Sequence, residues 1–113
     1  MESMHIIERF SKYLTAIEYP KGKTSWNIGG ILKNKNAFYK FDVREMFQLK
    51  DGTPAQTGRT HTHADKMVLE FTDKWVILDV AELNKYVISN KLKKVYLDKV
   101  IANLEWNIIL SKD

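Results

Sequence analysis

The chain has 113 residues, of which 44% are hydrophobic and 12% aromatic, so it suits one folded domain and wholesale disorder is not expected. It contains no cysteine, which excludes disulfide bonds, thiol catalysis and cysteine-ligated metal sites. No run of about 18 apolar residues is present, and the first residues lack the basic and apolar blocks of a signal peptide. We therefore expect a cytoplasmic protein with no membrane partner.

The net charge of +4 is unevenly distributed along the chain. Residues 20–66 hold nine basic and four acidic side chains, whereas residues 67–113 hold seven of each. The basic excess therefore lies in the middle of the chain, where a local positive field favours polyanions such as nucleic acid. A lysine-rich, solvated surface is the plainer interpretation.

The first half of the chain predicts a helix followed by a hairpin. Residues 3–18 predict an amphipathic helix, because apolar side chains recur there at helical spacing, and Pro20 ends it. Residues 25–32 predict a strand containing two glycines, and residues 38–47 predict a second strand after a polar turn. Residues 50–63 are a long loop-like segment, and loops of this length are often functional in a small domain.

The second half predicts two strands, two helices and a closing apolar segment, at residues 66–71, 75–80, 79–90, 97–105 and 106–110 respectively. Asp79 is the expected N-cap of the first of these helices, with Glu82 three residues later in a capping-box arrangement. The three tryptophans lie within apolar stretches and predict core packing, although an exposed Trp26 would offer a stacking platform.

The strand at residues 38–47 has two chemically different faces. Successive side chains point to opposite sides of a strand, which gives an apolar set, Tyr39, Phe41, Val43 and Phe47, and a polar set, Lys40, Asp42 and Arg44. The apolar face requires a core. The polar face places a carboxylate between two cations, a combination that is useful beside a phosphate or a metal ion. The alternative is a solvent-facing edge with an ion pair.

The sequence Asp42-Val43-Arg44 resembles the acid-x-Lys half of the PD-(D/E)XK restriction-endonuclease-like nucleases. In that family an N-terminal helix precedes a hairpin whose first strand carries an Asp and whose second carries the acid-x-Lys pair. The order of predicted elements is similar over about residues 5–90, and a helical and strand tail follows. Arg44 stands where the family usually has Lys, and Asn27 stands at the position of its first Asp.

This resemblance implies a metal-dependent DNA endonuclease, or a degenerate relative of one. Asp42 and Glu18 would bind Mg²⁺ with the aid of Asn27, Arg44 would stabilise the phosphate, and Gln48 would orient water or substrate. An inactive relative would carry no cofactor. The implied fold class is α/β, as one mixed α+β domain over residues 1–113. A mixed sheet of four to five strands would be flanked by N- and C-terminal helices.

Basic and histidine residues around the polar strand are the expected nucleic-acid contacts, namely Lys33, Lys35, Lys40, Arg59, His61 and His63. The two histidines also permit a lower alternative, a His-x-His nickase that attacks a DNA phosphate through Tyr86.

A small nucleic-acid-binding protein of nuclease-like type is thus the leading expectation. A non-catalytic interaction protein is the alternative, for example an inhibitor or adaptor of a phage or mobile element that binds an acidic partner. A homodimer or another protein partner is compatible with either expectation.

Overall fold

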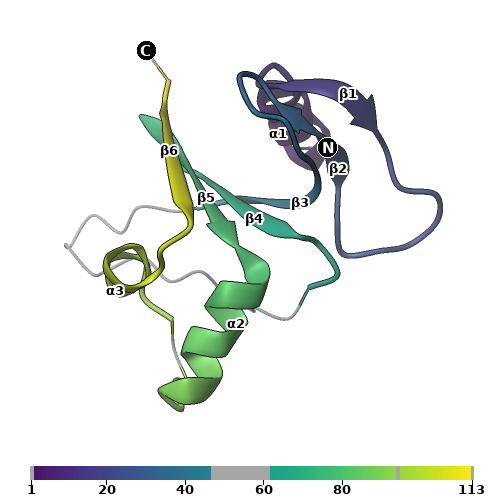
Figure 1. The fold of residues 1–113 in the computed structure, drawn as a ribbon. Helices are drawn as coiled ribbons and strands as arrows, with labels where there is room; N and C mark the ends of the chain where they lie inside the picture. Colours follow the sequence, from purple (N-terminus) through teal and green to yellow (C-terminus); the bar gives the residue numbers. More distant parts are fainter. Residues whose placement is uncertain (1, 47–61, 94, 113) are drawn as a thin grey trace.

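In the described part of the chain, six strands follow one another across a mixed sheet in chain order (Figure 1). The strands are β1 (Leu14–Glu18), β2 (Ile28–Leu32), β3 (Phe38–Glu45), β4 (Lys66–Glu70), β5 (Lys74–Asp79) and β6 (Asn107–Ser111), and the helices are α1 (Glu2–Ser11), α2 (Val80–Ser89) and α3 (Leu97–Asn103). Only β3 and β4 pair in parallel, and every other neighbouring pair is antiparallel. The computed structural model describes residues 2–46, 62–93 and 95–112.

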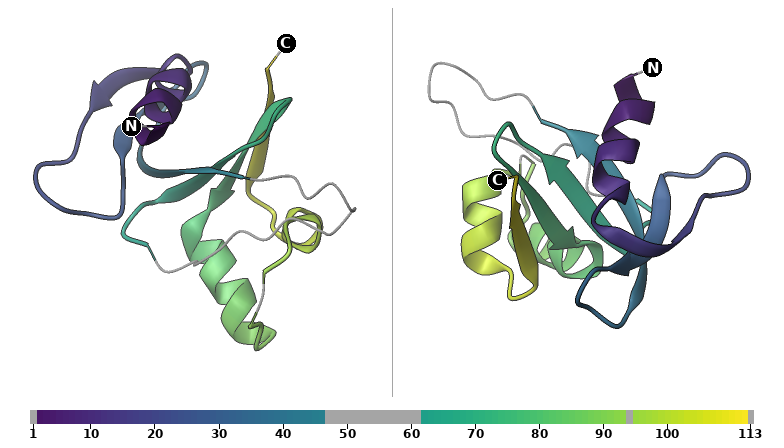
Figure 2. Two further views of the ribbon diagram at one scale, coloured as in Figure 1. Left: turned by 180° about the vertical axis from the view of Figure 1, so that it is seen from behind. Right: turned by 90° about the horizontal axis from the view of Figure 1, so that it is seen from above.

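The sheet divides the core into two clusters, one on each face. Helix α1 lies on one side of the sheet, and α2 and α3 lie on the other (Figure 2). On one face, Ile6 and Phe10 of α1 pack against Phe41, Val68 and Trp75. On the other face, α2 and α3 cover alternate residues of β4 and β5, namely Met67, Leu69, Val76 and Leu78. Both faces of β4 and β5 are therefore buried, which explains why these two strands are almost wholly apolar in sequence.

The expected helix over residues 3–18 is wrong in its second half. Helix α1 ends at Ser11, and the chain turns where the Tyr13 amide donates to the Phe10 carbonyl at 3.0 Å. The following residues form β1, which pairs with β2 from Leu14 opposite Leu32. Leu14 is buried with Phe10 in the same cluster, so its helical spacing was misleading. The sheet bonds of β1 outweigh the helical pattern of its sequence.

The other predicted helices and strands are confirmed within a few residues, and the expected hairpin is the antiparallel pair β2–β3. The expected long loop at residues 50–63 lies outside the described residues except for its last two. Asn34 lies in the turn of this hairpin with φ of 72°, a conformation that asparagine tolerates. The expected count of four to five strands is too low, because β1 and the closing segment, β6, both join the sheet. Among the described residues, no helix is long and apolar enough to span a membrane.

An ion-pair cluster ties α1 and the C-terminal segment to β4. Arg9 donates to both carboxylate oxygens of Glu70, at 2.8 and 2.7 Å, and Lys112 donates to Glu70 at 2.9 Å. The hydrogen bonds from Arg9 hold the pKa of the Glu70 carboxyl below its usual value, although burial opposes them. The same contact raises the pKa of Arg9.

Candidate nucleic-acid interface

The two faces of β3 are divided as the sequence predicts. Phe41 and Val43 are buried in the cluster beneath α1, and Tyr39 packs against the same cluster. Lys40, on the opposite face, is exposed. Strand β3 lies between β2 and β4, so its polar face is part of the sheet surface and not an edge. Phe47 lies outside the described residues.

Asp42 and Arg44 form an ion pair along the polar face of β3. Arg44 Nη2 lies 2.9 Å from Asp42 Oδ2, and Arg44 Nε lies 3.3 Å from Oδ1. Asp42 is only 7% exposed, so its charge has lost most of its water and requires a cation. Both carboxylate oxygens therefore contact the guanidinium, in the two-point geometry that arginine favours.

Asn27 is brought next to this pair, where it extends the pairing of β2 with β3. Its backbone amide donates to the Phe41 carbonyl at 2.8 Å, and its side-chain Oδ1 accepts from the Val43 amide at 2.7 Å. The oxygen that would ligate a metal ion is thus engaged in a hydrogen bond to the backbone.

Glu18 does not join the group. It is exposed on β1 and pairs with Gly29, which in turn pairs with Lys40 of β3. Two strand spacings, or roughly 10 Å, therefore separate the backbones of Glu18 and Lys40. Within the described part of the chain, no three acidic or histidine side chains come together as metal ligands. The side-chain oxygens of Asp42 and Asn27 that would ligate a metal ion are also already engaged in hydrogen bonds. These residues therefore do not fit a Mg²⁺ site as they stand. Gln48 lies outside the described residues.

An aromatic and cationic surface covers the face of β2 and β3 that carries the Asp42–Arg44 pair. We call Trp26, Phe38 and Lys40 the platform. Lys40 Nζ lies 5.3 Å from the centroid of the Trp26 ring, within the range of a cation–π contact. Trp26 is partly exposed and Phe38 is 39% exposed. Gly29 lies beneath both rings, and a Cβ built there would be 2.7 Å from Phe38 and 3.4 Å from Trp26.

The segment before β4 flanks this platform. Asp65 forms two hydrogen bonds with the backbone of Lys40, because its amide donates to the Lys40 carbonyl and its side-chain carboxylate accepts from the Lys40 amide. The His63 amide donates at 2.7 Å to Oγ of Ser25, the residue before Trp26, and the His63 side chain is exposed. His63 can therefore contribute to the same surface. Arg59 and His61 lie outside the described residues.

The two turn lysines do not share one surface. Both are exposed in the β2–β3 turn, but Lys35 lines a pocket that also includes Tyr39, whose side chain points away from the platform. Of the three predicted lysines, Lys33 and Lys40 therefore remain candidates for the basic surface around the platform.

Tyr86, the nucleophile of the nickase alternative, packs against the core on the α2 side of the sheet. Its hydroxyl accepts from the Asn103 amide at 3.5 Å. The histidine pair of that alternative includes His61, which is not described.

One feature was missed from the sequence, a buried lysine between two aromatic rings. Lys66 is 4% exposed, and its Nζ lies 3.6 Å from the Trp106 ring centroid and 4.4 Å from that of Tyr39. It also donates to Asp79 Oδ1 at 2.7 Å. The available signal was a lysine at a core position of the strand that begins Lys66-Met67-Val68.

Asp79 is confirmed as the N-cap of α2, because its Oδ2 accepts from the Glu82 backbone amide. The expected capping box is not completed. The Glu82 carboxylate instead accepts from the backbone amides of Glu105 and Trp106 and fixes the start of β6.

Comparison of the chain with protein-family models, with curated proteins and with solved structures finds no match. The function is therefore inferred from the geometry of the platform and of the Asp42–Arg44 pair.

Proposed function

We propose that this protein binds single-stranded nucleic acid through the platform on β2 and β3, and that it does not cut it. The observation that carries this proposal is the partly exposed Trp26 ring with Lys40 Nζ 5.3 Å from its centroid. An aromatic ring stacks with any base, and a neighbouring ammonium contacts the phosphate backbone. Phe38 provides a second exposed ring on the same face.

The state of the acidic group supports binding without hydrolysis. Asp42 is paired through both oxygens with Arg44, and the Asn27 oxygen bonds to the Val43 amide. Metal-dependent hydrolysis would require the carboxylate to exchange its guanidinium partner for the ion. Asp42 in this proposal holds Arg44 in position on β3, close to the basic surface.

A degenerate restriction-endonuclease-like ancestry remains part of the proposal. The resemblance implies a helix, a hairpin and a further strand in that order. Helix α1, the β2–β3 hairpin and the parallel strand β4 support it by following this order, with β1 as an additional strand between α1 and the hairpin. Asn27 also lies beside Asp42-Val43-Arg44, where the family places its first acid.

A protein partner with an acidic surface is the second candidate. Ile17 of the edge strand β1 is 40% exposed, and Tyr19, just after this strand, is 61% exposed. Exposed apolar residues near a basic surface also suit a protein interface.

Binding to fluorescein-labelled oligothymidylate, followed by anisotropy at several salt concentrations, tests the proposal. Lys40→Ala should weaken binding and lower the slope of log K against log salt by about 0.7, the value for one phosphate contact on a single strand. Lys85→Ala removes the same charge from an exposed site on α2 and is the matched control. Equal losses of affinity in the two variants would show that net charge, and not a contact at the platform, causes the effect.

Cleavage is assayed in parallel with Mg²⁺ or Mn²⁺ on single-stranded, double-stranded and branched DNA. The proposal expects no cleavage. Cleavage that Asp42→Ala abolishes would overturn its non-catalytic part and restore the nuclease. The absence of salt-sensitive binding to any of these substrates would overturn the binding itself and favour the protein partner.

A further inference from the structure

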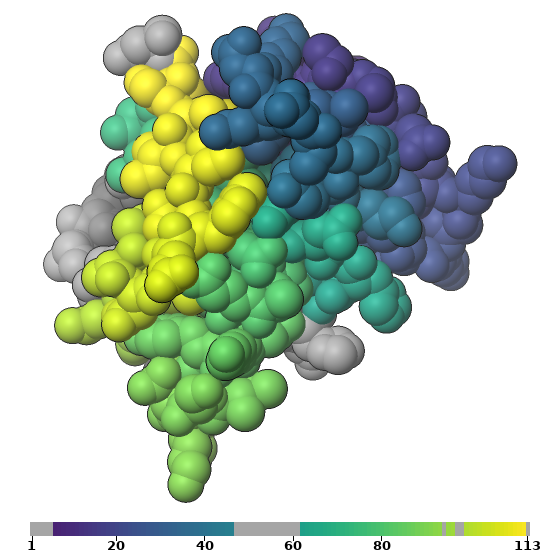
Figure 3. All heavy atoms as spheres, viewed as in Figure 1, coloured from purple at the N-terminus to yellow at the C-terminus, as the bar shows by residue number. Residues whose placement is uncertain are grey.

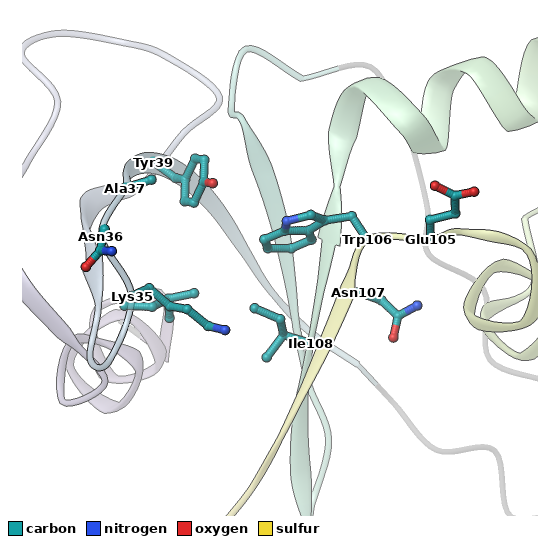
Figure 4. A pocket seen from close by; sticks show the side chains of 9 residues that line it. Lys35, Asn36, Ala37, Tyr39, Glu105, Trp106, Asn107 and Ile108 are labelled. Atoms are coloured by element: carbon teal, nitrogen blue, oxygen red, sulfur yellow. The ribbon is translucent and has the colours of Figure 1, made fainter.

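A pocket lies on the opposite face of the sheet from the platform, between the β2–β3 turn and the start of β6 (Figure 4). Its volume is about 290 Å³. The space-filling view shows these two segments side by side, the C-terminal one in yellow and the β2–β3 one in blue (Figure 3). Tyr39 lines the pocket and Lys40 belongs to the platform, and neighbouring residues of a strand face opposite sides. The pocket and the platform are therefore separate surfaces.

Two aromatic rings form a rigid wall of this pocket. Tyr39 and Trp106 meet edge to face, with ring centroids 6.1 Å apart. Lys66 contacts both rings, and Glu82 binds the backbone amide of Trp106 at 3.1 Å. Lys66 and Glu82 are not among the residues that line the pocket, so they support Tyr39 and Trp106 from outside the cavity. The wall is thus positioned before any ligand arrives, which lowers the cost of binding.

The rest of the lining is mixed, with apolar side chains, two asparagines and one cation directed at the cavity. Leu32, Ala37 and Ile108 contribute apolar surface. The Lys35 side chain extends across the cavity toward Ile108, whereas the Glu105 carboxylate points away from it (Figure 4). Among the described residues, no carboxylate forms a salt bridge with Lys35. The side-chain amide of Asn107 donates to the Leu104 carbonyl at 3.0 Å.

We propose that this pocket binds a small molecule with a flat ring and an anionic group. The ring would lie against Tyr39 and Trp106, and the carboxylate or phosphate would pair with the Lys35 ammonium. The Tyr39 hydroxyl is a second donor for the ligand. A cavity of this size, at the lower end of ligand pockets, accepts one aromatic acid or one nucleotide. This proposal does not depend on nucleic-acid binding at the platform.

The test follows the indole N–H signals of the three tryptophans in ¹⁵N-labelled protein during titration. AMP and benzoate represent the two sources of such an anion, and adenosine and benzamide are their uncharged counterparts. We expect AMP or benzoate to shift the Trp106 signal saturably with a dissociation constant on the order of 1 mM, and the uncharged probe to bind more weakly. The signal of Trp75, which is 1% exposed, should stay fixed.

Lys35→Met and Lys33→Met provide the matched pair of variants. Both remove one exposed lysine charge from the same turn, but only Lys35 lines the pocket. Lys35→Met should weaken binding of the anionic probe by about tenfold or more, and Lys33→Met should leave it unchanged. Equal losses would overturn the proposed contact. The proposal is also overturned if no probe shifts the Trp106 signal up to about 10 mM. A shift of the Trp26 signal alone by AMP would assign binding to the platform and contradict the pocket.

Discussion

Lys66 and Trp106 are joined by a closed ring of contacts that connects the pocket wall to α2. The Lys66 ammonium lies 3.6 Å from the Trp106 ring centroid and donates to Asp79, which caps α2 by accepting from the Glu82 amide. The Glu82 carboxylate then accepts from the Trp106 amide and closes the ring. A charge buried in this way is tolerated because every member has a partner.

The Asp79→Asn variant tests the ion pair between Asp79 and Lys66 in this set of contacts. Asparagine keeps an oxygen to cap α2 but leaves the buried Lys66 ammonium without its anion. The free energy of unfolding should fall by about 2–4 kcal/mol, as measured by urea denaturation. The double variant with Lys66→Met should recover part of this loss. If the two single losses simply add, Lys66 and Asp79 are not coupled.

The Glu82→Gln variant tests how β6 is attached. Glutamine retains one acceptor oxygen, so one of the two amides at Glu105 and Trp106 loses its partner. We expect a loss of about 1–2 kcal/mol and faster hydrogen exchange at these amides. Glu8→Gln, at an exposed position of α1, is the control and should change neither quantity. Unchanged exchange in Glu82→Gln would show that other contacts fix β6.

The Glu70 cluster predicts a specific dependence of stability on pH. The pKa of Glu70 is lowered in the folded protein from a reference value of 4.5, chiefly by the hydrogen bonds from Arg9. A lowered carboxyl pKa stabilises the fold above the unfolded value, and this contribution disappears as pH falls through the folded value. The stability difference between the parent protein and Glu70→Gln should therefore be full at neutral pH and shrink below pH 4.5. Urea denaturation at several pH values measures it, and a difference that grows in acid would contradict this assignment.

The two neighbouring glycines of β2 should respond differently to alanine. At Gly30 the added Cβ would meet the Thr15 carbonyl oxygen at 3.0 Å and Leu14 at 3.2 Å, so the backbone of β1 must shift. Gly30→Ala should cost about 1–3 kcal/mol. At Gly29 the closest atom is the far end of the exposed Phe38 ring, which can move aside. Gly29→Ala should cost less than about 1 kcal/mol but weaken nucleic-acid binding, because it displaces a platform ring. Equal stability losses with unchanged affinity would contradict the role of Gly29.

The sequence predicts the local elements better than their arrangement. The alternation of Tyr39 to Arg44 correctly predicts a strand with two different faces, because side-chain direction is a local property. The periodicity of residues 3–18 does not reveal β1, since Leu14 is buried in either structure and only pairing with Leu32 decides between them. The contacts of Lys66 with Asp79, Glu82 and Trp106 join β4, β5, α2 and the residue before β6, and no local pattern encodes such an arrangement. The proximity of Asn27 to Asp42-Val43-Arg44 follows from the predicted hairpin, whereas the distance of Glu18 depends on β1.

The most direct measurement of the central claim is the identity of the tryptophan that stacks on a single strand. Oligothymidylate is titrated into ¹⁵N-labelled protein, and the three indole N–H signals are assigned with Trp26→Phe and Trp106→Phe. The platform predicts that the Trp26 signal shifts saturably, that those of Trp75 and Trp106 do not, and that Trp26→Leu loses about 1–3 kcal/mol of binding free energy. Binding that leaves the Trp26 signal unchanged, or that persists undiminished in Trp26→Leu, would contradict the platform as the nucleic-acid site.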